Sequence, residues 1–386
     1  MKEIFFKSLS EENLISQLKA IGFDKDYLPI AQDKYRFRLY KIFNLRCPEA
    51  NILKQIALSV GCDCAVNRNV ITSEVEISDC ILGCTLSQLR EIVTKLKKQP
   101  FGLKLLAKKL ETQFKLVPEG FEIRGKLFDF AQKKYIMGIL NCTPDSFSDG
   151  GKYTDEKSAL KRTEQMLSDG ADIIDIGAES TRPNSNKVTV EEEQKRLMPI
   201  LKAVRKNFPN CVISVDTRNS DTAIAACNEG ADIINDISGF EHDKNMLKTV
   251  VKLGLPYVLT DFRKNGETEC IVDTVFENLY NKVKILEEEG FERKKIILDV
   301  GIGFGKTVDE NFELASGMKE FSSMGLPILL GHSRKSFLGK TLNMPPENLD
   351  CATAALSFHF FLVGANILRV HDVKTTAQML TLAEKF

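Results

Sequence analysis

Eight short apolar runs in the last two thirds of this chain each lead into polar or charged residues, and a helix-like segment follows each run. In chain order, the first run leads into Asn141, and the second ends at Gly177 and leads into Glu179, Ser180, Thr181 and Arg182. The other six lead into Asp216, into Asn235 and Asp236, into Asp261, into Asp299, into His332, and into Arg369 and His371. Eight strand–helix units in succession predict a (β/α)₈ barrel, an α/β fold whose active site lies at the carboxyl ends of its strands. The sequence therefore names the residues expected around such a site.

The periodicity also predicts where each element lies. We expect strands over residues 135–141, 171–177, 212–216, 233–236, 256–261, 296–299, 327–331 and 366–370. We expect helices over residues 155–169, 190–207, 219–229, 243–253, 272–290, 308–324, 348–364 and 374–385. Two connections, residues 141–154 and 178–190, are longer than a compact barrel needs. Long loops of this kind usually bind or cover a ligand.

The chain has 386 residues, more than the roughly 250 that a barrel of this type needs. We expect the barrel over residues 131–386 and a smaller α/β domain over residues 1–130. In the smaller domain, apolar spacing predicts helices over 10–21 and 51–60, strands over 63–72 and 75–82, and two helices within 85–112. These residues do not indicate what that domain does.

Composition excludes several classes of function. The formal net charge is zero, so nothing indicates general affinity for nucleic acid or an anionic membrane. No stretch approaches 18 uncharged apolar residues, and the charged N-terminus lacks the apolar region of a signal peptide, so we expect a cytoplasmic protein. The ten cysteines are then expected as reduced thiols. The spacing of Cys62 with Cys64, and of Cys80 with Cys84, is a poor match to zinc sites and favours buried residues.

Cationic side chains follow the second, seventh and eighth predicted strands, which with the first are neighbours in a closed barrel. They are Arg182, Lys335, Arg369 and His371, and Asn141 lies among them. Converging cations favour a phosphate or diphosphate ligand, whereas separate cations are surface charges or ion-pair partners. The side-chain carbonyl of Asn141 suits a hard cation such as Mg²⁺, although an Asn here also suits a turn.

Acceptor-rich side chains end the third, fourth and sixth strands, at Asp216, Asn235 and Asp299. Such groups are costly to bury without partners, so they indicate a flat ligand rich in N–H groups or an internal ion-pair network that includes Lys335. The segment at 301–307, GIGFGKT, is not a Walker A motif, because Val300 stands where the first Gly is required. Its glycines favour close approach to a flat ligand, with Phe304 either against that ligand or in the core.

Nothing in the sequence favours covalent catalysis. Cys142 and Ser333 lie near strand ends without an obvious paired base. His371 suits either a base or a phosphate contact. A diphosphate pocket without a nucleophile indicates a substrate that carries its own leaving group.

Seven segments in the right order resemble those of dihydropteroate synthases. They are MGILNCTPDSFSDGG (137–151), DIIDIGAESTRP (172–183), SVDT (214–217), INDI (234–237), GIGFGK (301–306), SRKS (333–336) and RVHDV (369–373). The resemblance implies a transferase of folate biosynthesis that condenses 6-hydroxymethyl-7,8-dihydropterin diphosphate with p-aminobenzoate. It also implies that Mg²⁺ assists departure of the diphosphate before the aryl amine attacks.

The matching positions imply a role for each residue. For the diphosphate they are Asn141, which also meets Mg²⁺, Thr181, Arg182, Arg369 and His371. For the pterin they are Asp216, Asn235, Asp299 and Lys335. For p-aminobenzoate they are Phe147, Pro183, Phe304 and Ser336, where Ser336 meets the carboxylate. Asp149 on the first long loop is expected in catalysis with Asp216, Asp299 and Lys335, and the two long loops are expected to exclude water.

Three positions depart from the pattern that is usual in this family. Val300 replaces Pro after Asp299, Thr260-Asp261-Phe262 replace Met-His-Met, and Asn184 replaces Gly. Two other functions therefore stay open, a pterin-dependent methyltransferase and a non-catalytic pterin-binding homologue. The small-molecule substrates are the expected partners, in a homodimer, the commonest form of soluble oligomers.

Overall fold

The computed structural model describes residues 4, 6–9, 11–142, 152–178, 188–262 and 268–385. The chain divides into two compact units, Met1–Leu116 and Val117–Phe386. The division lies before the boundary expected at residue 130, because the segment from Val117 onward belongs with the barrel.

The first unit is a three-stranded antiparallel sheet with helices, in the order β1-β3-β2. Its strands are β1 (Phe37–Arg46), β2 (Asp63–Val66) and β3 (Ile77–Thr85), and its helices are α1 (Leu14–Ala20), α2 (Leu28–Tyr35), α3 (Cys47–Ser59), α4 (Leu86–Leu96) and α5 (Leu103–Thr112). The sequence did not predict β1, in which charged and apolar residues mix. Cys64, Cys80 and Cys84 are buried in the core of this unit, and all ten cysteines of the chain are free thiols.

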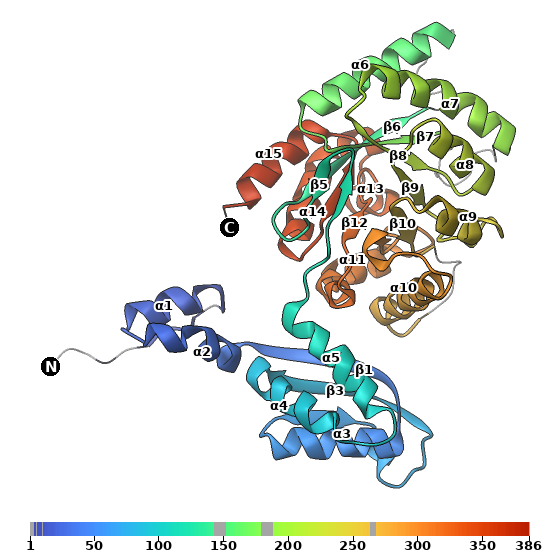
Figure 1. Ribbon diagram of the computed structural model, residues 1–386. Helices are drawn as coiled ribbons and strands as arrows, with labels where there is room; N and C mark the ends of the chain where they lie inside the picture. Colours follow the sequence, from blue (N-terminus) through green and yellow to red (C-terminus); the bar gives the residue numbers. More distant parts are fainter. Residues whose placement is uncertain are drawn as a thin grey trace. The chain divides into compact units, whose positions relative to one another are not determined.

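The second unit is a closed barrel of eight parallel strands surrounded by helices (Figure 1). The strands are β6 (Tyr135–Asn141), β7 (Ile173–Gly177), β8 (Val212–Asp216), β9 (Ile233–Asp236), β10 (Tyr257–Thr260), β11 (Ile296–Asp299), β12 (Ile328–Leu330) and β13 (Ile367–Val370). The helices are α6 (Lys152–Ser168), α7 (Val190–Asn207), α8 (Ser220–Asn228), α9 (Met246–Leu253), α10 (Ile271–Glu288), α11 (Val308–Ser316), α12 (Met318–Phe321), α13 (Ser336–Leu342), α14 (Asp350–Leu362) and α15 (Val373–Ala383). The predicted (β/α)₈ barrel is confirmed.

Two details of the helices differ from the prediction. The helix expected over 308–324 is interrupted at Gly317, where a side chain would collide with Val272 of α10 at 2.6 Å. The short helix α13 was not predicted, and it places Lys335 at its N-cap position.

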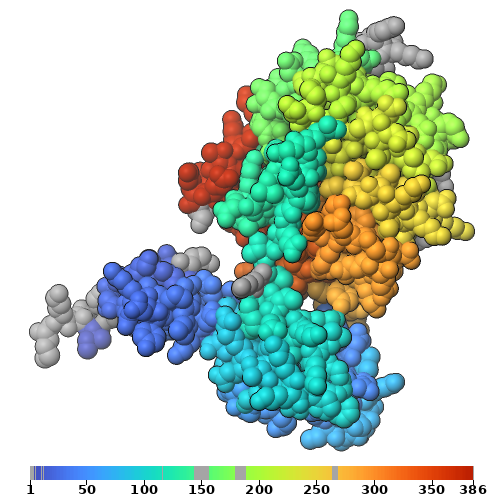
Figure 2. All heavy atoms as spheres, viewed as in Figure 1, coloured from blue at the N-terminus to red at the C-terminus, as the bar shows by residue number. Residues whose placement is uncertain are grey.

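A short hairpin closes the amino-terminal end of the barrel. Its strands are β4 (Phe121–Ile123) and β5 (Lys126–Phe128). Phe121, Phe128 and Phe130 pack against the first inward-facing residues of the barrel strands, such as Val212 and Leu329. The hairpin of β4 and β5, teal in Figure 2, crosses the barrel face that is turned to the viewer. The candidate site therefore lies at the opposite end of the strands.

Inward-facing residues change from apolar to polar along each strand. On β8, Val212 belongs to the lower apolar layer, whereas Ser214 and Asp216 follow at alternate positions. On β7, Asp175 follows Ile173 in the same way. Alternate residues of a strand point to the same side, so a polar layer lies next to the apolar layer, nearer the carboxyl ends of the strands. In the described part of the chain, no helix is long and apolar enough to cross a membrane.

The hairpin yields a prediction about the domain boundary. Deleting residues 1–116 leaves the barrel core complete, and we expect its thermal unfolding to stay cooperative with little change in Tm. Deleting residues 1–130 also removes three buried Phe side chains, each contributing about 1.5–3 kcal/mol, so we expect a loss on the order of 5 kcal/mol. Urea unfolding of both variants measures the difference. Equal stability of the two deletions would contradict the role given to the hairpin.

Candidate active site

A buried carboxylate, Asp175 on β7, organises the polar layer of the barrel. It is fully buried and accepts hydrogen bonds from Ser214 Oγ, from Asn235 Nδ2 at 3.1 Å and from Arg369 Nε at 2.6 Å. These partners come from β8, β9 and β13. One carboxylate thus joins four strands of the barrel and accepts hydrogen bonds from three side chains.

Arg369 extends this network to Asp216, whose Oδ2 accepts from its Nη2 at 2.7 Å. Burial raises the pKa of Asp216 to about 7, although the guanidinium of Arg369 opposes this shift. The sequence predicted Arg369 as a diphosphate contact. In this structure its Nε and Nη2 donate to Asp175 and Asp216, and its Nη1 has no hydrogen-bond partner among the described residues.

Asp299 and Lys335 form the other side of this polar layer, which is the floor of the pocket. Asp299 is buried, and its Oδ1 accepts from the backbone N–H of Gly301 at 2.8 Å. Burial raises the pKa of Asp299, and burial lowers the pKa of Lys335 to about 8, although the charge of Asp299 opposes the second shift. The ammonium of Lys335 lies 3.5 Å from the ring centroid of Phe304. A cation at this distance is attracted to the aromatic face.

The glycines of residues 301–305 permit close approach to protein atoms. Gly301 has φ 69°, and a side chain there would lie 1.9 Å from the Asp261 carbonyl oxygen. Gly303 has φ 82°, and a side chain there would lie 2.7 Å from Cδ of Lys335. The structure thus gives these glycines a role in packing the loop around Lys335.

A buried ion pair fixes the same loop. Lys306 Nζ lies 3.1 Å from Asp261 Oδ2 and also donates to the carbonyl oxygens of Gly301 and Phe304, at 3.0 and 3.3 Å. The two charged side chains are 0% and 2% exposed. Asp261, which departs from the usual family pattern, is therefore the counter-ion of Lys306.

His371 lies at the end of β13, where two neighbouring elements hold it. Its backbone N–H donates to Ser333 Oγ at 3.2 Å, and its Nδ1 lies 3.0 Å from the same oxygen. Its carbonyl oxygen accepts from Arg162 Nη2 of α6 at 2.6 Å. Asn141 and Ser336, the last residue of β6 and the first of α13, are exposed.

The structure thus brings together Asp216, Asn235, Asp299, Lys335 and Arg369 from the predicted set, with Phe304 beside Lys335. Five further predicted residues lie outside the described ranges: Phe147, Asp149, Thr181, Arg182 and Pro183. So does Asn184, one of the departures from the family pattern.

Sequence reasoning missed Asp175, Ser214 and the Asp261–Lys306 pair. Asp175 interrupts the apolar run IIDIG two residues before its end, a position that faces the barrel interior by strand alternation. That alternation was the available signal. It also separates Asn235, which faces Asp175, from Asp236, which accepts from Ser238, Phe240 and Tyr257.

His332 at the end of β12 is structural in this arrangement. It is fully buried, its Nε2 lies 2.7 Å from Ser357 Oγ, and burial lowers its pKa to about 4. At neutral pH the ring is therefore uncharged and adds nothing to the cations of the site.

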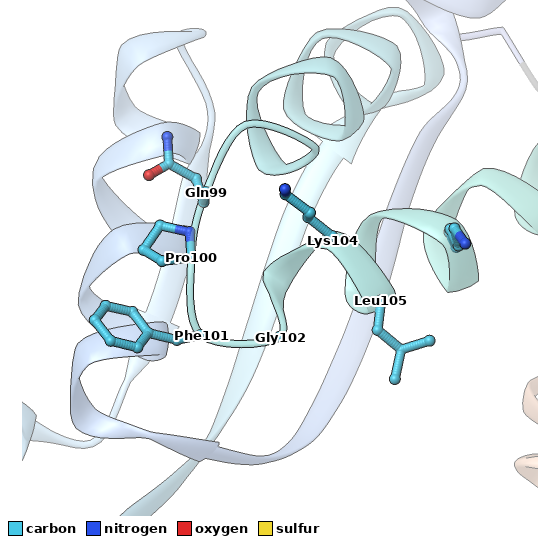
Figure 3. A pocket seen from close by; sticks show the side chains of 7 residues that line it. Gln99, Pro100, Phe101, Gly102, Lys104 and Leu105 are labelled. Carbon is cyan, nitrogen blue, oxygen red and sulfur yellow. The ribbon is translucent and has the colours of Figure 1, made fainter.

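A hollow of about 440 Å³ lies in the first unit, lined by Gln99, Pro100, Phe101, Gly102, Lys104, Leu105 and Lys108 (Figure 3). Phe101 and Leu105 are more than half exposed there. The hollow contains none of the predicted site residues. The carboxyl ends of the barrel strands therefore stay the candidate active site.

Comparison with known proteins shows the family of the chain. The family described as "Pterin binding enzyme" matches residues 137–371. The chain is 43% identical over 253 residues to the dihydropteroate synthase of Clostridium beijerinckii, a match that covers 65% of this chain and 94% of that protein. A dihydropteroate synthase structure from Clostridium difficile, solved in the presence of pteroic acid, has a TM-score of 0.65 and 35% identity, covering 67% of this chain and 98% of that one.

One relative matches more of the chain. A probable bifunctional folylpolyglutamate synthase/dihydropteroate synthase of Haloferax volcanii is 34% identical over 354 residues, 87% of this chain and 42% of that protein. A match of this length extends into the first unit, because the second unit begins only at Val117. Part of the first unit therefore also matches that longer protein.

The ion pair under the loop yields a prediction about stability. Asp261→Asn removes the counter-charge of a fully buried Lys306, so we expect a loss of about 3–5 kcal/mol in the free energy of unfolding. Urea unfolding measures it. The double variant Asp261→Asn with Lys306→Met removes both charges, and we expect it to recover a large part of the loss. If the single variant were as stable as the parent, the pair would not support the loop.

Proposed function

The chain belongs to the pterin-binding enzyme family, among the dihydropteroate synthases, and we propose how its barrel carries out their reaction. The enzyme condenses 6-hydroxymethyl-7,8-dihydropterin diphosphate with p-aminobenzoate. The bond between the pterin methylene carbon and the diphosphate oxygen breaks, and the amine nitrogen forms a new bond to that carbon. The amine loses a proton, and 7,8-dihydropteroate and diphosphate are released.

The observation that carries the assignment is the polar layer around Asp216, Asn235, Asp299 and Lys335. Three acceptor-rich side chains from the ends of β8, β9 and β11, and the ammonium of Lys335 at the start of α13, lie beyond the apolar layer of the barrel. A pterin ring offers an amino group and ring N–H groups to the carboxylates and the amide, and ring acceptors to Lys335. Such a ligand supplies the partners that buried acceptors require.

The diphosphate end of the proposal rests on Asn141, Arg369 and His371, together with Thr181 and Arg182 of the second long loop. The guanidinium of Arg369 on β13 supplies positive charge, and the imidazole of His371 at the end of β13 supplies an N–H donor. Positive groups that are already in position stabilise the charge that develops on a leaving diphosphate.

Mg²⁺ fits the same end of the site. Mg²⁺ is usually held by one or two protein oxygens, water and substrate phosphates, and Asn141 presents an amide oxygen on an exposed side chain at the end of β6. When bound there, the metal neutralises charge on the diphosphate oxygens. Among the described residues, no group of three or more His, Cys, Asp or Glu side chains is placed to hold a metal.

The remaining assignments concern p-aminobenzoate and water. We place the amine substrate against Phe304 and Pro183, with Ser336 at its carboxylate and Phe147 nearby. Asp149 on the first long loop joins Asp216, Asp299 and Lys335 in catalysis. The carboxylates stabilise positive charge that develops on the pterin methylene, and closure of the two long loops keeps water from trapping it.

A turnover assay with the two named substrates, with and without Mg²⁺, tests the function. Lys335→Ala removes the ammonium from the pterin pocket, and we expect kcat/KM to fall roughly 10- to 100-fold, the effect of losing a charged hydrogen bond. Lys340→Ala, on the exposed side of α13, is the matched control and should leave turnover unchanged. Unchanged kinetics in Lys335→Ala, or no dihydropteroate from the parent enzyme, would refute the proposal.

The pH dependence of kcat/KM tests the ionisation of Asp216 and Lys335. The carboxylate of Asp216, the form that pairs with Arg369, predominates above its pKa of about 7. The ammonium of Lys335 predominates below its pKa of about 8. We therefore expect a bell-shaped profile with its maximum between these values, and Asp216→Asn should remove the acidic limb. A profile that still falls at acid pH in Asp216→Asn would assign that limb to another group.

The homodimer and the cytoplasmic location stay predictions from the sequence. Size-exclusion chromatography with light scattering measures the first directly.

A further inference from the structure

Ser333 makes two contacts to the same histidine. It follows β12, is 6% exposed, and its Oγ lies 3.2 Å from the backbone nitrogen of His371 and 3.0 Å from Nδ1 of the ring. A single hydroxyl therefore determines both where the backbone of His371 lies and how its ring is turned.

The hydrogens of this contact can be counted. The backbone N–H of His371 is always a donor, so Ser333 Oγ accepts it. The hydroxyl has one hydrogen of its own to donate. In the described part of the chain Ser333 Oγ has no other hydrogen-bond partner, so Nδ1 is the one protein acceptor within its reach there. When the hydroxyl donates to Nδ1, Nδ1 is the acceptor and the neutral ring carries its hydrogen on Nε2.

The backbone of His371 is held from a second side. Arg162 of α6 donates from Nη2 to the His371 carbonyl oxygen at 2.6 Å. The peptide groups on both sides of His371 are thus bonded to side chains of other elements. These bonds limit rotation of the residue, so the surrounding protein determines the direction in which Nε2 points.

We propose that Ser333 is a positioning residue that holds His371 in its Nε2–H tautomer, so that this N–H donates to a diphosphate oxygen of the pterin substrate. The inference rests on the proposed function and adds a residue to it. In the opposite tautomer a lone pair of Nε2 would face the anion and repel it. Ser333 itself need not touch the substrate.

Imidazole nitrogen NMR tests the tautomer without any activity measurement. The chain has four histidines, so a sample labelled with ¹⁵N-histidine gives few signals, and His371→Asn identifies those of His371. At a pH where the ring is neutral, we expect its proton on Nε2 in the parent, a mixture of tautomers in Ser333→Ala, and the parent tautomer again in Ser333→Thr. A proton on Nδ1 in the parent, or an unchanged spectrum in Ser333→Ala, would overturn the proposal.

Calorimetric binding tests the consequence. We expect Ser333→Ala to weaken binding of 6-hydroxymethyl-7,8-dihydropterin diphosphate about tenfold, the effect of one hydrogen bond to a charged group. Binding of the same pterin without its diphosphate should not change. Equal weakening of both ligands, or no weakening of the diphosphate, would overturn the positioning role.

A matched control is available in the same barrel. Ser357 also bonds a histidine ring, at 2.7 Å from His332 Nε2, and both residues of this pair are fully buried. Ser357→Ala should change the His332 signals and leave diphosphate binding unchanged, and thermal melting reports the folding of each variant. If the parent forms no dihydropteroate, the proposed function fails, while the NMR result still decides the tautomer.

Discussion

The buried ion pair between Asp175 and Arg369 is the constraint on which the rest of the site depends. A carboxylate without solvent is costly unless it has a partner charge and a hydrogen bond for its remaining lone pairs. Asp175 meets both conditions through Arg369, Ser214 and Asn235. Because Arg369 also donates to Asp216, the position of each floor residue depends on the others, and the network favours one arrangement of four strands.

The charge balance of this network explains how the site suits its ligand. Asp175, Asp216 and Asp299 face the charges of Arg369 and Lys335, so the floor has one more acid than base when all are ionised. Burial moves the pKa values of Asp216 and Lys335 toward neutrality from opposite sides, which keeps both groups near the point of proton exchange. A ring with several N–H donors relieves the excess of acceptors, whereas an anion does not. The diphosphate must therefore lie outside this floor, toward Asn141 and His371.

Most of the barrel could be predicted because each strand ends where its apolar run ends. The predicted limits of β6, β8, β9 and β11 agree with the structure residue by residue. The chemistry of strand ends likewise predicted Asp216, Asn235 and Asp299 as one cluster, and the family resemblance added Lys335 to it. Asp175 could not be found in this way, because it lies inside an apolar run and its partners are 39 to 194 residues away in sequence. The domain boundary also depends on distant packing, since the Phe residues of the hairpin meet the barrel strands only in the folded protein.

Two of the three departures from the family pattern, at positions 261 and 300, have a physical explanation in the same terms. An added carboxylate at position 261 would make the pocket wall more negative if it faced the ligand alone. Its pairing with Lys306 removes that charge, and the contacts of Lys306 with the carbonyl oxygens of Gly301 and Phe304 tie the pair to the loop that carries Phe304. Val300 likewise leaves intact the turn in which Asp299 accepts from Gly301 N–H, at 2.8 Å. Both residues lie in or beside this loop, and neither removes an acceptor or the ammonium of the pterin pocket. The departures therefore argue against a loss of the reaction and for an altered support of the same pocket.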